Sequence, residues 1–385
     1  MNIPSLRFPE FSGEWEMKKL GEIAEKVNSG KTPLGGENVY VDKGVLFIRS
    51  QNVNDNTLSF DNSTFITEEV NSTMKNSVVK PKDILLNITG ASLGRSCVVP
   101  EEFDTGNVNQ HVCIIRLGKN NEPYFFQPIF ASEKGQNIFI SLQTGSGREG
   151  LNFQSIKGIT LPVPSLTEQQ KIATFLTAVD DKLTQLKKKK TLLEQYKNGV
   201  MQKIFSQEIR FKDDDGKDFP DWEEKKLNGL VKILYGKDQK QVAEENGKYP
   251  ILGTGGIIGR TNQFLYDKPS VLIGRKGTID NPVYMDTPFW TVDTLFYTEV
   301  YPNTIPKWLF FKFQTINWYL YNEASGVPSL SGSTIYKIPI TLPSQQEQIK
   351  IANFLSAIDD KINYTTIQIE KTQQWKKGLL QQMFC

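Results

Sequence analysis

The chain has 385 residues, of which 38% are hydrophobic and 23% charged, and its formal net charge is +2. This length allows several domains with their own cores, and the composition is that of an ordinary globular protein. No apolar run approaches the roughly 20 residues of a membrane span, and the N-terminus lacks a signal-peptide layout, so we expect a cytoplasmic protein.

The chain begins with an entry segment, residues 6–20, that recurs as residues 209–227. Both copies carry an Arg-Phe pair, and Trp15 matches Trp222 ahead of a Lys-Lys-Leu ending. Short apolar runs separated by Asn, Asp, Gly and Ser follow the first copy, a pattern typical of β-strands and turns. The predicted strands are residues 45–50, 83–88, 96–100 and 111–117. The aromatic-rich segment 122–139 then predicts a helix.

The second entry segment is followed by a domain of the same plan. Its predicted strands are residues 231–236, 270–275, 282–285 and 294–300, and residues 306–321 predict a helix. Both domains are therefore expected to have mixed α+β folds.

A long helical segment closes each half of the chain. Residues 164–205 return as residues 343–384 at a constant offset of 179, and 18 of the 42 aligned positions are identical. Ser165 and Thr167 precede Glu168 in a plausible capping arrangement. Apolar residues then follow at alternating spacings of three and four, interrupted by Lys190 and Lys197.

An apolar stripe of this width needs a partner, and the nearest is the other copy. We expect the two helices to pair as an antiparallel coiled coil through Ile172, Leu176, Val179, Leu183, Ile351, Leu355, Ile358 and Ile362. The alternative is that each helix merely covers its own domain. The resulting fold class is α+β, a pseudo-twofold internal repeat with the boundaries 1–163, 164–206, 207–342 and 343–385.

Several motifs suggest chemistry but fit structural roles better. The glycine-rich segment 253–260 lacks the residue order of a phosphate-binding loop and does not precede a helix. Asn281 to Tyr284, NPVY, resembles the NPPY motif of adenine methyltransferases, but its third residue differs. An acidic-x-Lys spacing at residues 223–225 has no acidic partner upstream. His111 has no catalytic pattern around it, and the three cysteines have no metal-ligand spacing.

What remains is a set of polar clusters at predicted strand ends in both domains. Arg can recognise guanine and Asn or Gln adenine through paired hydrogen bonds, while Lys, Ser and Thr hold phosphates. Any one cluster fits ordinary turn chemistry, and the DNA-binding hypothesis rests on their recurrence in both halves. The candidate DNA-contacting residues are Lys31, Thr32, Arg49, Gln51, Asn87, Thr89, Ser92, Arg95, Asn109, Gln110 and Arg148 in the first domain, and Lys237, Lys240, Arg260, Asn262, Arg275, Lys276 and Thr278 in the second.

A duplicated frame that encloses two unlike domains resembles the specificity subunits of type I restriction–modification systems. The resemblance covers nearly the whole chain. Besides the helical copies and entry segments, it includes SGKTP at residues 29–33, GRKGTID at 274–280 and FWTVDTLFY at 289–297.

The resemblance implies a non-catalytic subunit whose two target recognition domains each bind half of a split DNA sequence. The helices would set the spacing and dock two methyltransferase subunits that use S-adenosylmethionine to methylate adenine N6. Restriction subunits using ATP and Mg²⁺ would complete the complex, so no cofactor or metal is expected on this chain. Two alternatives stay open, a stand-alone adenine methyltransferase and a protein-binding adaptor.

Overall fold

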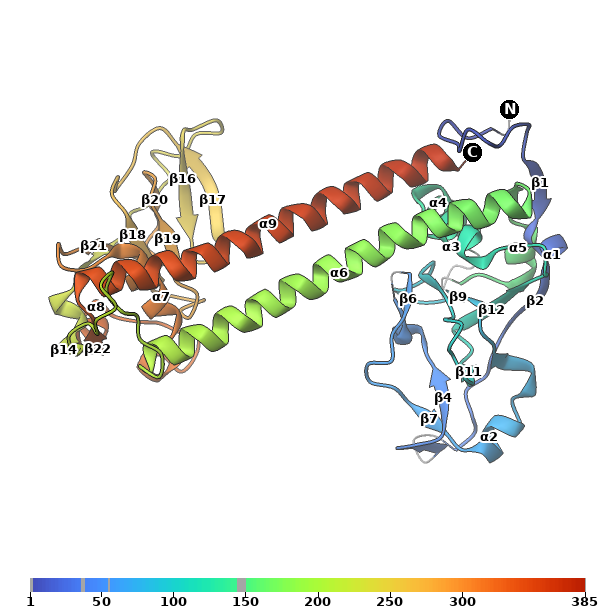
Figure 1. The fold of residues 1–385 in the computed structure, drawn as a ribbon, viewed down its shortest axis with the longest axis horizontal. Coiled ribbons are helices and arrows are strands. Elements are labelled where there is room, and N and C mark those ends of the chain that lie inside the picture. Colours follow the sequence, from blue (N-terminus) through green and yellow to red (C-terminus); the bar gives the residue numbers. More distant parts are fainter. Residues whose placement is uncertain (1–2, 36–38, 55, 144–149, 385) are drawn as a thin grey trace. The chain divides into compact units, whose positions relative to one another are not determined.

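A computed structural model of the chain describes residues 3–35, 39–54, 56–143 and 150–384. It divides into two compact units. Unit 1 comprises residues 1–187 and 368–385, and unit 2 comprises residues 188–367. Each unit therefore contains one variable domain together with parts of both long helices (Figure 1).

The domain of unit 1 contains thirteen strands and five helices among its described residues. They are β1 (Glu16–Lys19), α1 (Leu20–Ile23), β2 (Ala24–Ser29), β3 (Tyr40–Val41), β4 (Val45–Ile48), β5 (Val53–Asn54), β6 (Thr57–Leu58), β7 (Phe65–Ile66), α2 (Glu68–Ser72), β8 (Val78–Val79), β9 (Ile84–Asn87), β10 (Ser96–Val98), β11 (Gly106–Val108), β12 (Val112–Leu117), α3 (Pro123–Ala131), α4 (Glu133–Ser141), α5 (Phe153–Gly158) and β13 (Thr160–Val163).

Two sheets form the body of this domain. The first has the order β10-β9-β12-β2 and is antiparallel, and the second has the order β3-β7-β4-β11-β8 with a parallel β4–β11 pair. Alternate residues of β9 enter different cores, Leu85 towards the second sheet and Ile84 and Leu86 towards the helices. Strands buried on both faces are continuous apolar runs, which is why the sequence predicts them well.

Unit 2 repeats this topology with fewer strands. Its domain elements are β14 (Glu223–Lys226), β15 (Val231–Tyr235), β16 (Tyr249–Gly253), β17 (Gly256–Thr261), β18 (Ser270–Gly274), β19 (Val283–Met285), β20 (Trp290–Thr291), β21 (Leu295–Val300), α7 (Pro306–Gln314), α8 (Gly332–Lys337) and β22 (Pro339–Leu342). The sheet β19-β18-β21-β15 corresponds to β10-β9-β12-β2, and the parallel pair β16–β20 corresponds to β4–β11. The predicted α+β repeat is confirmed.

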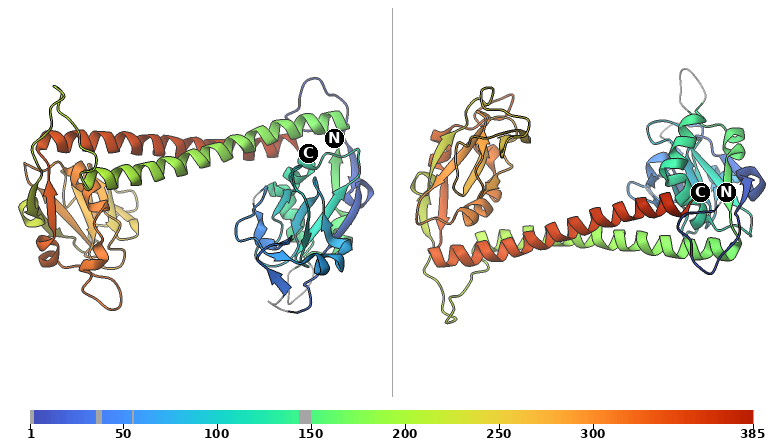
Figure 2. Two further views of the ribbon diagram at one scale, coloured as in Figure 1. Left: turned by 60° about the horizontal axis from the view of Figure 1, so that its bottom comes forward. Right: turned by 90° about the horizontal axis from the view of Figure 1, so that it is seen from above.

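The long helices are α6 (Leu166–Phe205) and α9 (Gln345–Met383). In unit 1, Ile172, Leu176 and Val179 of α6 share one core with the domain and with Leu379 and Met383 of α9. The first half of α6 thus lies against the end of α9, which is antiparallel packing. The first described residues of the chain and the end of α9 belong to the same unit (Figure 2), where the Leu6 N–H donates to the Gln382 carbonyl at 2.9 Å.

In unit 2, Ile351, Leu355 and Ile358 of α9 share a core with Met201 and Ile204 of α6 and with the domain. The predicted pairing residues are buried in both units, except that Ile362 is half-buried. In each unit, all of these residues except Leu183 share a core with both the domain and the other helix, so each helix pairs with its partner and also covers its domain.

Two lysines that interrupt the apolar stripe form equivalent ion pairs between the helices. Lys376 contacts Asp180 in unit 1, and Lys197 contacts Asp359 at 2.7 Å in unit 2. Both pairs follow the repeat offset of 179 residues. Their lysines are only 11% and 12% exposed. A half-buried charge pair at one position of a helix interface can fix the register of the helices.

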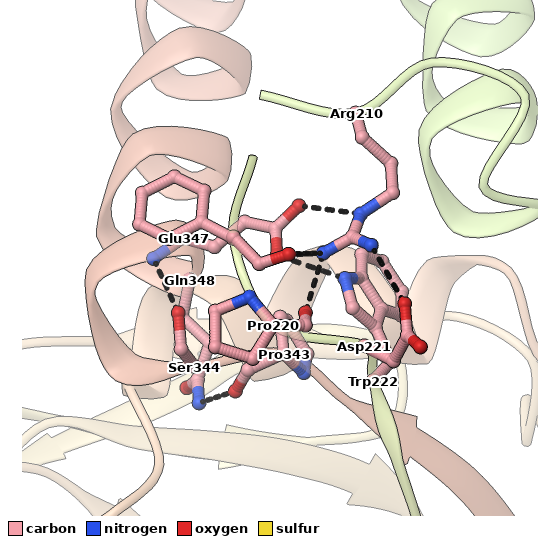
Figure 3. Close-up of polar contacts among 9 residues, drawn as sticks. Arg210, Pro220, Asp221, Trp222, Pro343, Ser344, Glu347 and Gln348 are labelled. Atoms are coloured by element: carbon pink, nitrogen blue, oxygen red, sulfur yellow. Dashed lines mark hydrogen bonds and ion pairs between the residues drawn. The ribbon is translucent and has the colours of Figure 1, made fainter. Parts of the chain in front are cut away.

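A buried glutamate at the start of each long helix anchors the entry segment. In unit 2, Arg210 donates to Glu347 through Nε at 3.3 Å and Nη2 at 2.9 Å, and Trp222 Nε1 donates to Glu347 at 3.0 Å (Figure 3). Hydrogen bonding to this carboxylate raises the pKa of Arg210. In unit 1, Arg7 contacts Glu168 at 2.7 and 2.8 Å. The entry segments then continue as β1 and β14, which pair with β13 and β22 just before each long helix.

The glutamine after each glutamate ties the long helix to its domain. Gln169 accepts from the backbone N–H of Glu122 at 2.8 Å and donates to the Pro164 carbonyl at 2.9 Å. Gln348 accepts from Ile305 at 2.7 Å and donates to Pro343 at 2.9 Å. Because Glu122 and Ile305 are the N-cap residues of α3 and α7, the same contact joins two helices in each unit.

Several expectations need correction in detail. The predicted helix at residues 122–139 is two helices, because Ser132 leaves helical geometry and its hydroxyl accepts from the Gly135 N–H. The helix predicted at residues 306–321 ends at Gln314 and a short 3-10 turn follows. The glycine-rich segment 253–260 is a hairpin between β16 and β17. The expected cap is confirmed, since Ser165 accepts from the Glu168 N–H at 3.4 Å.

Cys97 and Cys113 are free and buried, and burial raises the pKa of each thiol to about 12. Neither thiol is therefore poised to react as a thiolate at neutral pH. Among the described residues, no helix is long and apolar enough to cross a membrane.

Replacing Glu347 with alanine is expected to destabilise unit 2 by about 3 kcal/mol, because Arg210 and the Trp222 indole lose their buried acceptor. Hydrogen exchange of β14 and the first turns of α9 measures this. Gln346→Ala, at the exposed neighbouring position, is the matched control. Equal protection in the two variants would contradict the anchoring role.

A double-mutant cycle on Asp180 and Lys376 is expected to give a coupling energy of about 1 kcal/mol in unit 1, measured by denaturant unfolding of the full chain. The control is the exposed pair of Lys377 on α9 and Glu133 on α4, 3.5 Å apart, which should couple near zero. Equal coupling energies in the two pairs would show that partial burial does not strengthen the ion pair.

Candidate nucleic-acid interface

One edge of the first sheet of unit 1 collects most of the polar clusters singled out in the sequence. The central strand β12 is antiparallel to both neighbours, and it pairs Val112 with Asn87 of β9 and Cys113 with Ser29 of β2. The ends of β2 and β9 and the start of β12 therefore lie at the same edge. The loops 29–33, 87–95 and 107–111 meet there.

A chain of hydrogen bonds joins these three loops. The Thr32 hydroxyl donates to Gln110 Oε1. Gln110 Nε2 lies 3.1 Å from His111 Nε2, and His111 Nδ1 lies 2.6 Å from Thr89 Oγ1. The structure thus brings together three of the predicted residues through His111, which the sequence had indicated only as a core or turn residue.

The close approach of the loops depends on Gly30. A Cβ at this position would lie 1.6 Å from the Val108 carbonyl oxygen, which no side chain can accept. The Gly30 N–H donates to the Asn109 carbonyl at 3.1 Å. The glycine in SGKTP is therefore required because the backbone of the neighbouring loop occupies the place of a side chain.

Unit 2 builds the corresponding edge in the same way. The strand β21 pairs Phe296 with Tyr235 of β15 and Leu295 with Gly274 of β18. The loops 235–240, 274–278 and 291–294 therefore meet at that edge. Gly236 is equivalent to Gly30, since its Cβ would lie 2.0 Å from the Val292 carbonyl oxygen.

Arg275 lies at the centre of the unit 2 edge. Its backbone N–H donates to the Thr294 carbonyl at 2.8 Å, and its Nη1 donates to the Asp293 carbonyl at 3.1 Å. The guanidinium carbon lies 5.4 Å from the ring centroid of the exposed Tyr235. Arg275 is half-exposed, so it retains donors that can reach a ligand.

Exposed cations accompany both edges. Within the part of the chain that the structure describes, their side chains form no ion pair. They are Lys31, Arg95, Lys237, Lys240 and Lys276. Unpaired positive charge at a polar loop cluster favours binding of a polyanion.

Other predicted residues support the loops. Asn87 is fully buried and donates to the Ser50 carbonyl at 2.9 Å and to the Ser92 hydroxyl at 3.1 Å. Asn109, 8% exposed, accepts from the His111 N–H at 3.0 Å. These contacts indicate that both asparagines stabilise the edge from inside the domain.

Thr278, in the unit 2 loop 274–278, is exposed like the unpaired cations.

The loop after β4 adjoins the same edge in unit 1. The Asn109 N–H donates to the Ile48 carbonyl at 3.1 Å, so Arg49 and Gln51 lie beside the other clusters. Gln51 is exposed, and Arg49 is half-buried with an Nε that has no hydrogen-bond partner among the described residues. Arg148 lies outside the described residues.

Two predicted residues of unit 2 are set apart from the edge. Arg260, on β17, donates to the carbonyls of Gly247 at 2.7 Å and Lys248 at 2.9 Å. Asn262 accepts from the Lys248 N–H at 3.1 Å and donates to Glu244. Both side chains stabilise the turn at residues 244–248 of their own domain.

The motifs that suggested enzymes also have structural roles. Tyr284 of NPVY lies on β19, with Lys307 Nζ 4.1 Å from its ring centroid. Glu223 and Lys225 form an exposed ion pair on β14. In the described ranges, no three His, Cys, Asp or Glu side chains are grouped to hold a metal ion.

Comparison with known proteins identifies the family. The family model of the type I restriction modification DNA specificity domain matches residues 12–195 and 220–372. The chain therefore belongs to the type I restriction–modification DNA specificity family and carries two copies of its domain. As a member, it is a DNA-recognition subunit and not a catalytic one. The resemblance inferred from the sequence is confirmed.

Relatives along the whole chain agree with this assignment. The putative type I restriction enzyme MjaX specificity subunit of Methanocaldococcus jannaschii is 23% identical, over 98% of this chain and 95% of the relative. The MjaVIII specificity subunit of the same organism is 24% identical, over 97% and 92%.

Solved structures show the same fold. The type I restriction–modification S subunit of M. genitalium covers 100% of this chain and 99% of its own, with a TM-score of 0.67 at 16% identity. A chain from a structure of the type I restriction–modification system covers 96% and 97%, with a TM-score of 0.57 at 15% identity.

Arg275→Ala is expected to lower the preference for the correct base by about 10-fold or more at one position, or at a few adjacent positions, of the DNA target. The effect should be local because Arg275 lies at the edge of unit 2 and not at that of unit 1. Selection from a random duplex library by the full complex measures this. Lys268→Ala, an exposed cation before the opposite end of β18, should leave the selected sequence unchanged. Uniform loss of selectivity at every position would instead indicate a folding defect.

Proposed function

We propose that each unit binds one half of a bipartite DNA target through the sheet edge described above. The main support is that both units place unlike polar and basic loops at equivalent strand ends. Those loops follow β2, β9 and β11 in unit 1 and β15, β18 and β20 in unit 2. Two domains that recognise different half-sites need different side chains at equivalent positions.

The long helices act in this proposal as spacer and docking surface. Two half-sites joined by a stiff spacer bind more tightly than either alone, because the second contact forms at high effective concentration. Two methyltransferase subunits dock on the helices and methylate adenine N6 with S-adenosylmethionine, after flipping the base from the duplex. Restriction subunits that use ATP and Mg²⁺ cleave unmodified DNA.

In this proposal the chain itself binds no cofactor. Its residues supply register and sequence preference, with Lys31 and Lys237 suited to phosphates and Gln110 and Arg275 to base edges. The family assignment and the unpaired cations of both edges support the proposal.

Matched deletions in the two helices test the spacer. Removing residues 187–190 from α6 and 366–369 from α9 leaves Asp180–Lys376 and Asp359–Lys197 able to pair, since the deletions lie between these pairs in both helices. Four residues shorten a helix by about 6 Å, or nearly two base pairs at roughly 3.4 Å each.

We expect the methylated motif to keep both half-sites and to lose about two base pairs of spacer. Sequencing of N6-methyladenine in cells measures this. Deleting residues 187–190 alone is the control, because it breaks the register of the two ion pairs and should abolish methylation. An active complex with matched deletions and unchanged spacing would contradict the spacer role.

A further inference from the structure

Gln110 is held at the unit 1 edge by two side chains, although it is exposed. Thr32 donates to its Oε1, and its Nε2 lies 3.1 Å from His111 Nε2. A surface glutamine otherwise samples many rotamers. Fixing its amide before binding removes an entropic cost of recognition.

The direction of these hydrogen bonds follows from the chemistry of the groups. An amide nitrogen can only donate, so His111 Nε2 accepts from Gln110. In the neutral imidazole the proton then lies on Nδ1, which donates to Thr89 Oγ1 at 2.6 Å. The network therefore defines both the histidine tautomer and the orientation of the Gln110 amide.

Each polar atom of the Gln110 amide keeps one further bonding capacity. Oε1 has a second lone pair, and Nε2 has a second hydrogen. Adenine presents a matching pair in the major groove, the N7 acceptor and the N6 amino donor. We propose that Gln110 recognises an adenine in the half-site bound by unit 1, with Thr32 and His111 as positioning residues. This inference rests on the proposed function and deepens it.

The test uses the full chain assembled with its methyltransferase subunits. A random duplex library is selected by binding and sequenced. We expect Gln110→Ala to lower the preference for adenine at one position of one half-site by about 5- to 150-fold, the range of a good bidentate contact. All other positions should be retained. Asn120→Ala, an exposed loop residue beyond the opposite end of β12, is the control.

The positioning residues give independent readouts. Thr32→Val should weaken preference at the same position, and Thr32→Ser should restore it, because only serine keeps the hydroxyl. His111→Phe should also weaken it, because the phenyl ring offers no acceptor to the Gln110 amide nitrogen. An unchanged selected sequence in Gln110→Ala, or loss confined to the other half-site, would overturn the inference while leaving the proposed function intact. If the wild-type complex selects no split sequence, the proposed function fails, and this inference fails with it.

Discussion

The structure depends most on the buried glutamate and glutamine that begin each long helix. Glu168 and Glu347 are 2% and 0% exposed, and each accepts from the arginine of an entry segment. The next residue, Gln169 or Gln348, accepts from the backbone N–H of the N-cap residue of α3 or α7. In each unit, three segments distant in sequence are therefore joined at one turn of helix: the entry segment, the start of the long helix and the N-cap of a domain helix. A buried carboxylate is tolerated only when it is paired, so the joint cannot loosen without a large cost.

This joint explains how variable domains can share a constant frame. The residues that hold a domain to its helix lie in the repeated segments, and the residues at the sheet edge lie outside them. Gly30 and Gly236 keep the same close backbone approach in both units, whereas the polar side chains differ: Gln110 precedes β12 in unit 1, and Arg275 follows β18 in unit 2. Loop side chains can therefore change while the sheet edge that carries them keeps its geometry.

The sequence allows much of this to be predicted, but not all. The strands β9, β12, β18 and β21 were predictable because burial on both faces requires continuous apolar runs. The strands β1 and β14 were not, since EMKK and EEKK have no apolar alternation and owe their conformation to pairing with β13 and β22. Much of the second sheet is built from strands of two or three residues, too short to carry a pattern.

Side-chain partners were the least predictable feature. Lys197 and Lys376 interrupt an apolar stripe, and only the paired helices show that Asp359 and Asp180 compensate them. The side-chain contacts of the candidate site were equally hard to predict. Clusters such as NVNQH indicated polar loops, but the network through His111 requires strands brought together by the sheet. Asn87 illustrates the opposite case, because its position at the end of β9 places its side chain inside the domain.

Two units that recognise two half-sites of one DNA target should together specify a bipartite methylation motif. N6-methyladenine can be mapped in cells that express the methyltransferase subunits, with and without this chain. We expect a motif with two short specified segments separated by an unspecified spacer, present only with the chain. A continuous motif, or methylation that is unchanged when the chain is absent, would contradict it.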